Sequence, residues 1–174
     1  MRALSGKKDP EKVADAIIHH ADVRRMLLTQ KAIAEGGRAM IYHAAQIADN
    51  MNDALLRGDT AAFEQHDDHL GFYTPILKGF LTEMGYEASN HGMQVFGGHG
   101  YIKEWGMEQI VRDSRISTLY EGTTGVQALD LIGRKVLLTS KGKVIRDYTA
   151  EILKFCGQHA RNKYMRRFAW DLSL

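Results

Sequence analysis

The sequence places a lone carboxylate, Glu121, in a short turn between Tyr120 and Gly122, just before a helix that could begin at Thr123. An acid at this place could simply stabilise the positive end of that helix, an effect of about 0.3–1 kcal/mol. It could also act as a general base. A base that removes a weakly acidic proton needs burial beside apolar surface and nearby N–H groups that polarise a carbonyl. The residue types and their spacing leave both readings open.

A glycine cluster precedes this turn in the segment Gln94-Val-Phe-Gly-Gly-His-Gly100. Glycines there can end a helix in a sharp turn, and they can also let another group approach the bare backbone. The segment differs from the dinucleotide-binding fingerprint and from a Walker loop, because no strand precedes it and no Gly-Lys-Ser/Thr follows. Spacing alone therefore names no ligand.

The stretch from Gln94 to Gln127 resembles the signature of the carboxy-terminal helical domain of acyl-CoA dehydrogenases, flavoenzymes that desaturate acyl-CoA thioesters. The segments 21–28 and 31–39 resemble the first bundle helix of a large-chain branch of that family, and residues 74–82 resemble the next helix. The run YEGTTGVQALDLIGRK, from Tyr120 to Lys135, is typical of the same branch. The resemblance covers about residues 10–140.

The resemblance implies that Glu121 abstracts the substrate α-proton while the β-hydrogen leaves as hydride to flavin N5. The backbone N–H of Glu121 would hold the thioester carbonyl oxygen together with a flavin hydroxyl. Tyr120 and Gly122 match positions at the acyl-CoA substrate. The positions implied to contact FAD are Gln94, Val95, Phe96, Gly97, Gly98, Thr123, Thr124 and Gly125. The FAD at Gln94 to Gly98 would be bound mainly to a neighbouring subunit, so the resemblance also implies a homo-oligomer. The usual electron acceptor of the family is an electron-transfer flavoprotein.

Apolar residues recur at three- and four-residue intervals along most of the chain, and no sustained alternation indicates a strand. The sequence therefore predicts an all-α, antiparallel helical bundle. We expect a lead-in segment over residues 1–20, a four-helix bundle over residues 21–140, and the start of a truncated helical extension over residues 141–174. The expected helices span about 22–57, 61–95 with a break or kink near Thr74 caused by Pro75, 107–114, 123–139 and 144–164.

Side chains expected to face the core of these helices are Val23, Met26, Leu27, Ile33, Met40, Ile41, Ala44, Ile47, Ala48, Met51, Phe63, Leu70, Tyr73, Ile76, Leu77, Phe80, Met84, Val126, Leu129, Ile132, Val136 and Leu137. Cys156 is also expected in the core rather than as a nucleophile.

The net charge of +2 gives no electrostatic reason to expect a nucleic-acid or membrane partner. No apolar run approaches the roughly 20 residues of a membrane span, and a single cysteine suits a reducing cytoplasm. His66 and His69 share a helical face, but no third ligand stands at a recognisable spacing, so no metal site is expected. Arg112 and Asp113 also match the family order, and we interpret them as structural.

The family's amino-terminal and middle domains and its flavin-binding arginine segment have no counterpart here, so we expect a fragment that turns over little substrate by itself. The alternative is a truncated helical oligomerisation module without catalysis. Missing neighbours should leave apolar surface exposed, and we therefore expect a dimer or a larger species.

Overall fold

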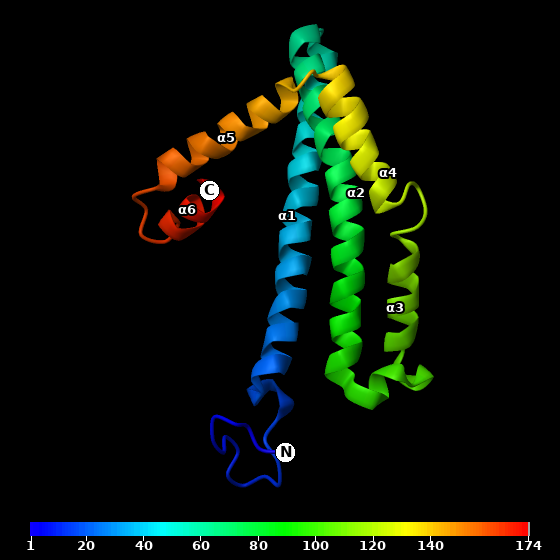
Figure 1. Ribbon diagram of the computed structural model, residues 1–174, viewed down its shortest axis with the longest axis vertical. Coiled ribbons are helices and arrows are strands. Elements are labelled where there is room, and N and C mark those ends of the chain that lie inside the picture. Colours follow the sequence, from blue (N-terminus) through cyan, green and yellow to red (C-terminus); the bar gives the residue numbers. More distant parts are fainter. Residues whose placement is uncertain (174) are drawn as a thin grey trace.

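The computed structural model describes residues 1–173, and its regular elements in that range are all helical. Two helices of 37 residues each, α1 (Ala21–Arg57) and α2 (Thr60–Phe96), form an antiparallel hairpin along the long axis of the molecule (Figure 1). Each helix is about 55 Å long, at a rise of 1.5 Å per residue. The all-α fold predicted from the sequence is confirmed.

The hairpin turn is short because both helix ends are capped by adjacent residues. Gly58 adopts a left-handed conformation with φ of 70°, and its N–H donates to the carbonyls of Ala54 and Leu55. That conformation favours glycine, which has no Cβ. Asp59 then begins α2, since its carboxylate accepts a hydrogen bond from the Ala62 N–H at 3.0 Å. The two long helices therefore pack side by side over most of their length.

Helix α2 continues through Pro75, so of the break or kink predicted near Thr74 the break is wrong. Proline has no N–H and leaves the carbonyl four residues earlier, at Gly71, without its helical hydrogen bond. The Nζ atom of Lys135 donates a hydrogen bond to that carbonyl from a distant part of the chain. The hydroxyl of Thr74 also donates to the Leu70 carbonyl at 2.7 Å. The helix remains continuous because a packed neighbour satisfies the carbonyl.

The chain then runs back along α2 (Figure 1). The elements in order are two short 3₁₀ turns (Gly97–Tyr101 and Lys103–Trp105), α3 (Met107–Ile116), α4 (Thr124–Leu129) and a π-helix (Asp130–Thr139). The sequence predicted one α-helix over 123–139, but its second part has the wider π-helical turn. In a π-helix, residues five apart are hydrogen-bonded neighbours. Accordingly, the Asp130 carboxylate lies 3.7 Å from the Nζ atom of Lys135.

The last two helices form an arm that leaves the hairpin (Figure 1). Helix α5 (Lys143–His159) starts after Gly142, and α6 (Arg166–Ser173) packs against it. The helix predicted over 144–164 is therefore present as α5, but it ends earlier than expected, at His159. The side-chain oxygen of Asn162 accepts hydrogen bonds from the N–H groups of Tyr164 and Met165, which starts a new helical segment. Cys156 is buried in this arm, as expected.

The hydrophobic core is small and lies where α2, the π-helix and α5 meet. Phe72, Val136 and Val144 are its buried members, and Ile76, Leu131 and Tyr148 pack around them. The rings of Tyr148 and Tyr73 meet edge to face at 5.9 Å between centroids. Burial raises the pKa of Tyr73 in this cluster. Such a core connects the arm to the hairpin at one end of the molecule.

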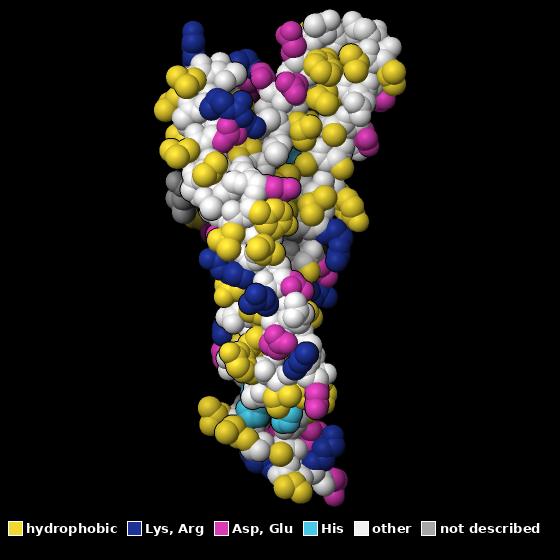
Figure 2. All heavy atoms as spheres, turned by 90° about the vertical axis from the view of Figure 1, so that its right-hand side faces the viewer, with side chains coloured by type: hydrophobic (Ala, Val, Ile, Leu, Met, Phe, Trp, Pro, Cys, Tyr) yellow, Lys and Arg dark blue, Asp and Glu magenta, His cyan; other side chains and the backbone are white. Residues whose placement is uncertain are grey.

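Several of the side chains expected to face inward are exposed instead. The buried members of the predicted set are Met26, Ala44, Ile47 and Val136, and its exposed members are Leu27, Ile41, Phe80, Val126, Leu129, Ile132 and Leu137. Only a few helices pack together at any level of the elongated molecule, so apolar faces remain without a partner. Figure 2 shows hydrophobic side chains spread along the outer face of the molecule. Even so, no helix within residues 1–173 combines the length and apolar character needed to cross a membrane.

The lead-in segment is folded around the carboxylate of Asp15. This carboxylate accepts hydrogen bonds from the N–H groups of Ala3 at 2.8 Å, Lys8 at 3.0 Å and Asp9 at 2.9 Å. The Arg2 guanidinium donates to it at 3.1 Å. The backbone N–H groups, first among them that of Asp9, hold the pKa of Asp15 far below its usual range. The start of the chain is thus a defined loop rather than a frayed end.

Candidate functional site: the Glu121 turn and the glycine loop

Glu121 lies in the turn that joins α3 to α4, beside the middle of α2 (Figure 1). Both Glu121, with φ of 55°, and Gly122, with φ of 88°, are in the left-handed region. That region costs a residue with a Cβ roughly 1–2 kcal/mol. At Gly122 this conformation favours glycine, and an added Cβ would lie 2.9 Å from the side-chain nitrogen of Gln127, which would have to move. The turn at Glu121 is strained, and the surrounding contacts must maintain it.

Lys78, in the middle of α2, contacts both sides of this turn. Its Nζ atom donates to the carbonyl of Ser117 at 3.0 Å and to the carbonyl of Gly122 at 2.7 Å. The same ammonium lies 5.9 Å from the centroid of the Tyr120 ring. Lys78 is not among the site residues predicted from the sequence. The one available signal was a lysine inside an otherwise apolar helical stretch, Pro75 to Leu81, which is where a long polar side chain needs a partner.

The start of α4 makes further contacts to the turn. The side-chain amide of Gln127 donates to the Glu121 carbonyl at 2.9 Å. The hydroxyl of Thr123 caps the first turn of α4, and the hydroxyl of Thr124 donates to the Glu83 carboxylate on α2 at 2.7 Å. Of the residues predicted to contact FAD, Thr123 and Thr124 therefore also have a local structural role. Gln127 and Glu83 are additional members of the site.

Two groups of Glu121 have no partner in the part of the chain that the structure describes. Its backbone N–H donates no hydrogen bond to any of residues 1–173, and its carboxylate is exposed. Tyr120 is also exposed, at 50%. Residues 1–173 therefore do not supply the apolar burial that a base requires. The turn therefore leaves the Glu121 carboxylate free to accept a hydrogen bond and the Glu121 backbone N–H free to donate one to a group outside residues 1–173.

The predicted glycine segment is the end of α2 and the turn after it. Gln94, Val95 and Phe96 form the last helical turn, and Gly97 leaves the helix with φ of 61° and ψ of −143°. Gly98 has no positive φ, and a Cβ there would meet nothing within 4 Å. The fold itself therefore does not require glycine at position 98. Its backbone is open to a group from outside the chain.

The two predicted FAD-contacting groups lie at different heights along α2. The turn is beside Gly79, where a Cβ would be 3.7 Å from the Thr124 side chain. Gln94 lies about 22 Å further along the same helix, at 1.5 Å rise per residue. The structure brings Tyr120 to Gly125 together around the carboxylate. It does not bring Gln94 to Gly98 into the same compact site.

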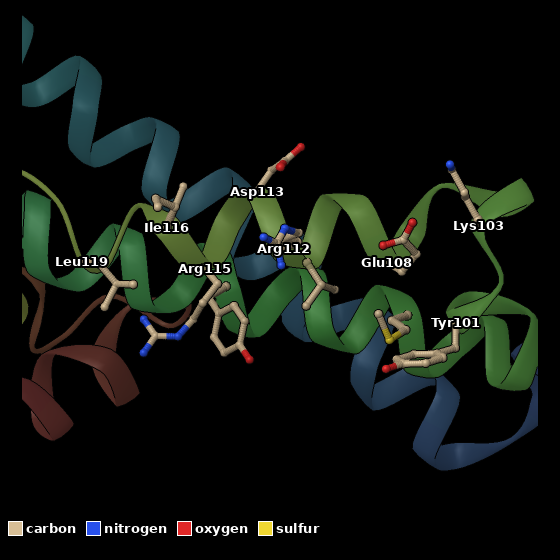
Figure 3. Close-up of a pocket in the computed structure, with 11 residues that line it drawn as sticks. Tyr101, Lys103, Glu108, Arg112, Asp113, Arg115, Ile116 and Leu119 are labelled. Atoms are coloured by element: carbon tan, nitrogen blue, oxygen red, sulfur yellow. The ribbon is translucent and has the colours of Figure 1, made fainter.

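A broad groove of about 730 Å³ runs between α2 and α3 (Figure 3). Ile116 and Leu119 give it an apolar part, and Arg112 and Arg115 are its guanidinium groups. The Arg115 guanidinium lies 5.6 Å from the ring centroid of Tyr86. None of the predicted site residues lines this groove. It is a separate feature from the Glu121 turn.

Arg112 and Asp113 do not form an ion pair with each other among the described residues. The Asp113 carboxylate instead accepts a hydrogen bond from the Gln109 side chain at 2.7 Å, one helical turn earlier. This contact stabilises α3 locally. It agrees with a structural role for Asp113.

His66 and His69 lie in α2, as their spacing indicated. Over residues 1–173, no group of three or more histidine, cysteine, aspartate or glutamate side chains is placed to hold a metal ion.

The chain is therefore an all-α protein built on a long helical hairpin. It carries a strained Tyr-Glu-Gly turn and an open glycine loop. Residues 5–137 match the family model described as acyl-CoA dehydrogenase, C-terminal domain. Because this match covers well over half of the chain, the chain belongs to the acyl-CoA dehydrogenase family. The resemblance of the sequence motifs is confirmed.

Individual relatives agree with this assignment. A 3-methylmercaptopropionyl-CoA dehydrogenase of Ruegeria pomeroyi is 46% identical over 121 residues, which is 70% of this chain and 20% of that protein. A butyryl-CoA dehydrogenase of Syntrophomonas wolfei is 35% identical over 97% of this chain and 27% of its own length. The subunit CarC of a caffeyl-CoA reductase-Etf complex from Acetobacterium woodii is 27% identical over 75% of this chain and 30% of its own. The chain thus spans between a fifth and a third of these relatives.

Proposed function

We propose that this chain serves as the C-terminal domain of an FAD-dependent acyl-CoA dehydrogenase and that Glu121 removes the α-proton of an acyl-CoA thioester. The observation that supports this most strongly is the left-handed turn that leaves both the Glu121 carboxylate and its N–H without a partner in residues 1–173. Loss of an α-proton moves negative charge onto the thioester carbonyl oxygen. A backbone N–H can donate to that oxygen while the carboxylate beside it takes the proton.

The residues proposed to hold FAD fit such a ligand in two ways. Gly98 exposes its backbone, and the fold itself does not require glycine at this position. The exposed side-chain amide of Gln94 lies one helical turn before it. Thr123, Thr124 and Gly125 are exposed around the start of α4. When bound, FAD supplies the acceptor for the β-hydrogen, which leaves as hydride. The segment from Gln94 to Gly98 and the segment from Thr123 to Gly125 lie apart along α2. This separation suits contacts to two different FAD molecules, with Gln94 to Gly98 contacting the FAD of a neighbouring subunit.

The burial that Glu121 needs is proposed to come from outside residues 1–173. The Glu121 side chain is exposed here, whereas a base that removes a weakly acidic proton needs apolar surface around it. We therefore propose little or no turnover by this chain alone, and activity in a homo-oligomer that contains the remaining domains. An electron-transfer flavoprotein is the proposed electron acceptor, and the cytoplasm the proposed location.

A second function, a helical oligomerisation module without catalysis, is favoured by a different observation. Large apolar side chains are exposed on several helices, among them Leu129 at 74%, Leu138 at 74% and Leu56 at 85%. Such surface can bury itself against another copy whether or not flavin binds. Flavin binding separates the two functions.

The first test is the visible absorbance of the purified chain after incubation with FAD and desalting. A retained flavin band would show that these residues form a cofactor site by themselves. A colourless chain would favour the oligomerisation module for this chain by itself. The contribution of Glu121 must then be measured in a complete enzyme.

The second test grafts this chain into the Ruegeria pomeroyi 3-methylmercaptopropionyl-CoA dehydrogenase in place of the segment that aligns with it. We expect Glu121→Gln to lower kcat of the graft by about 10²–10⁴-fold, the usual contribution of a general base. The matched control is Glu104→Gln, which changes an exposed glutamate on a neighbouring turn. Retention of the parent rate by Glu121→Gln, with FAD content unchanged, would exclude Glu121 as the base.

A further inference from the structure

We propose that Lys78 is a positioning residue for the Glu121 turn and that it acts through two backbone carbonyls. This inference rests on the proposed function of Glu121. Lys78 does not contact the carboxylate itself, since no ion pair within 4.0 Å joins them among the described residues. Its ammonium is instead committed to the backbone on either side of Glu121.

The two carbonyls that Lys78 binds lie on either side of Glu121 in the sequence. Ser117 precedes the Tyr120-Glu121 pair and Gly122 follows it, and the Lys78 Nζ donates to both, at 3.0 Å and 2.7 Å. An ammonium has three N–H donors, so one cation can bind both carbonyls at once. Without Lys78, neither carbonyl would have this partner, and one side of the turn could move independently of the other.

The conformation of the turn explains why such a contact is needed. Glu121 and Gly122 both have positive φ, which a glutamate adopts only when its surroundings impose it. The Gln127 amide holds the Glu121 carbonyl from the α4 side. Lys78 holds the turn from the α2 side. Together these contacts fix the direction in which the Glu121 carboxylate and N–H leave the backbone.

Helix α2 is a suitable support for this contact because Lys78 is fixed at several points. Its own carbonyl accepts a hydrogen bond from the Thr82 hydroxyl at 2.7 Å. The adjacent Gly79 is buried and packs close to Thr124 at the start of α4. A site held from a rigid helix keeps its geometry better than one held from a loop. Lys78 thus transmits the position of α2 to the turn.

The first experiment uses the whole chain and does not depend on catalysis. Backbone NMR signals are compared for the parent, Lys78→Met, Lys78→Arg and Lys135→Met. The Lys135 variant is the matched control, because it also removes a partly buried ammonium that binds a carbonyl, that of Gly71, away from the turn. We expect Lys78→Met to shift the signals of residues 117–123 while the rest of the bundle stays unchanged.

The pattern among the variants decides the proposal. Lys78→Arg keeps a cation with several donors, so its signals over 117–123 should stay closer to the parent than those of Lys78→Met. Unchanged signals at 117–123 in Lys78→Met would overturn the proposal. Changes spread over the whole bundle, or complete unfolding of Lys78→Met, would assign Lys78 a general role in packing and overturn it equally.

The second experiment measures the consequence for catalysis in the grafted dehydrogenase described above. A displacement of about 1 Å at a catalytic group can cost about 10²-fold in rate, so we expect Lys78→Met to lower kcat by about 10- to 100-fold. KM should change less than about twofold, because a turn that binds substrate equally well loses mainly transition-state stabilisation. Lys78→Arg should recover part of the rate, and Lys135→Met should leave it near the parent value.

The two experiments test the role of Glu121 as the base and the role of Lys78 as a positioning residue separately. If Glu121→Gln retains the parent rate, the proposed function fails, while the NMR comparison still decides whether Lys78 holds the turn. If Glu121→Gln is inactive and Lys78→Met keeps the parent kcat, the base is correct and the positioning role of Lys78 is wrong.

Discussion

At the scale of single residues, the site depends on backbone conformation as much as on side-chain chemistry. Glu121 is one of two non-glycine residues with positive φ among residues 1–173, and the other, Lys141, lies in the turn before α5. The carboxylate therefore leaves the chain in a direction that a helical or extended residue would not give it. Gly122 favours this geometry, since a side chain there would be strained by the φ of 88° and would displace the Gln127 amide.

Replacement of Gly122 by alanine should destabilise the turn. The new Cβ would lie 2.9 Å from the Gln127 amide and 3.3 Å from a Val126 methyl group. With the strain of positive φ added, we expect a loss of about 1–3 kcal/mol in the free energy of unfolding. Urea denaturation of the chain measures it. The control is Gly36→Ala, in the interior of α1 with open space around it, which should raise stability by about 0.5–1 kcal/mol. Equal effects of both variants would contradict this account of the turn.

At the scale of elements, a distant contact keeps α2 continuous. A proline inside a helix removes a hydrogen bond, and the sequence signal for a break at Pro75 was physically sound. The signal failed because Lys135, on the π-helix, supplies a donor to the Gly71 carbonyl. Nothing in the sequence near Pro75 shows where that donor comes from.

The coupling of these two residues can be measured by a double-mutant cycle. We expect Lys135→Met to lower the free energy of unfolding by about 1–3 kcal/mol, because it leaves the Gly71 carbonyl without its partner. In a Pro75→Ala background the alanine N–H can bond to that carbonyl, so Lys135→Met should cost less. A coupling of at least about 0.5 kcal/mol between the two positions is expected. Additive effects would show that Lys135 acts only through its other neighbour, Asp130.

At the scale of the whole molecule, the elongated hairpin leaves more apolar surface open than its helices can cover. Val126, Leu129 and Ile132 lie at or after the start of α4 and are all at least half exposed. Their helical spacing predicted that they face the core, because an apolar stripe on a helix normally packs against a partner helix. No partner helix covers this stripe in residues 1–173. The three side chains do form an apolar stripe, but the predicted burial is wrong.

We therefore expect the chain to associate in solution. Sedimentation velocity at micromolar concentration should give a dimer or a larger species, since contiguous apolar surface favours association. Addition of moderate salt should leave this association intact, because it would be driven by apolar burial rather than by charge. A monomer over the whole concentration range would contradict the prediction.

The sequence by itself determined the helical class, the family, the end of the first long helix at residue 57, and the turn that carries Glu121. These features depend on local rules: spacing along a helix, the capping chemistry of adjacent residues, and the conformational freedom of glycine. Tertiary structure alone decided which faces are covered and what holds the turn. Lys78 and Glu83 reach the turn from about 40 residues away. No local pattern records such contacts, because they depend on how α2 and α4 pack together.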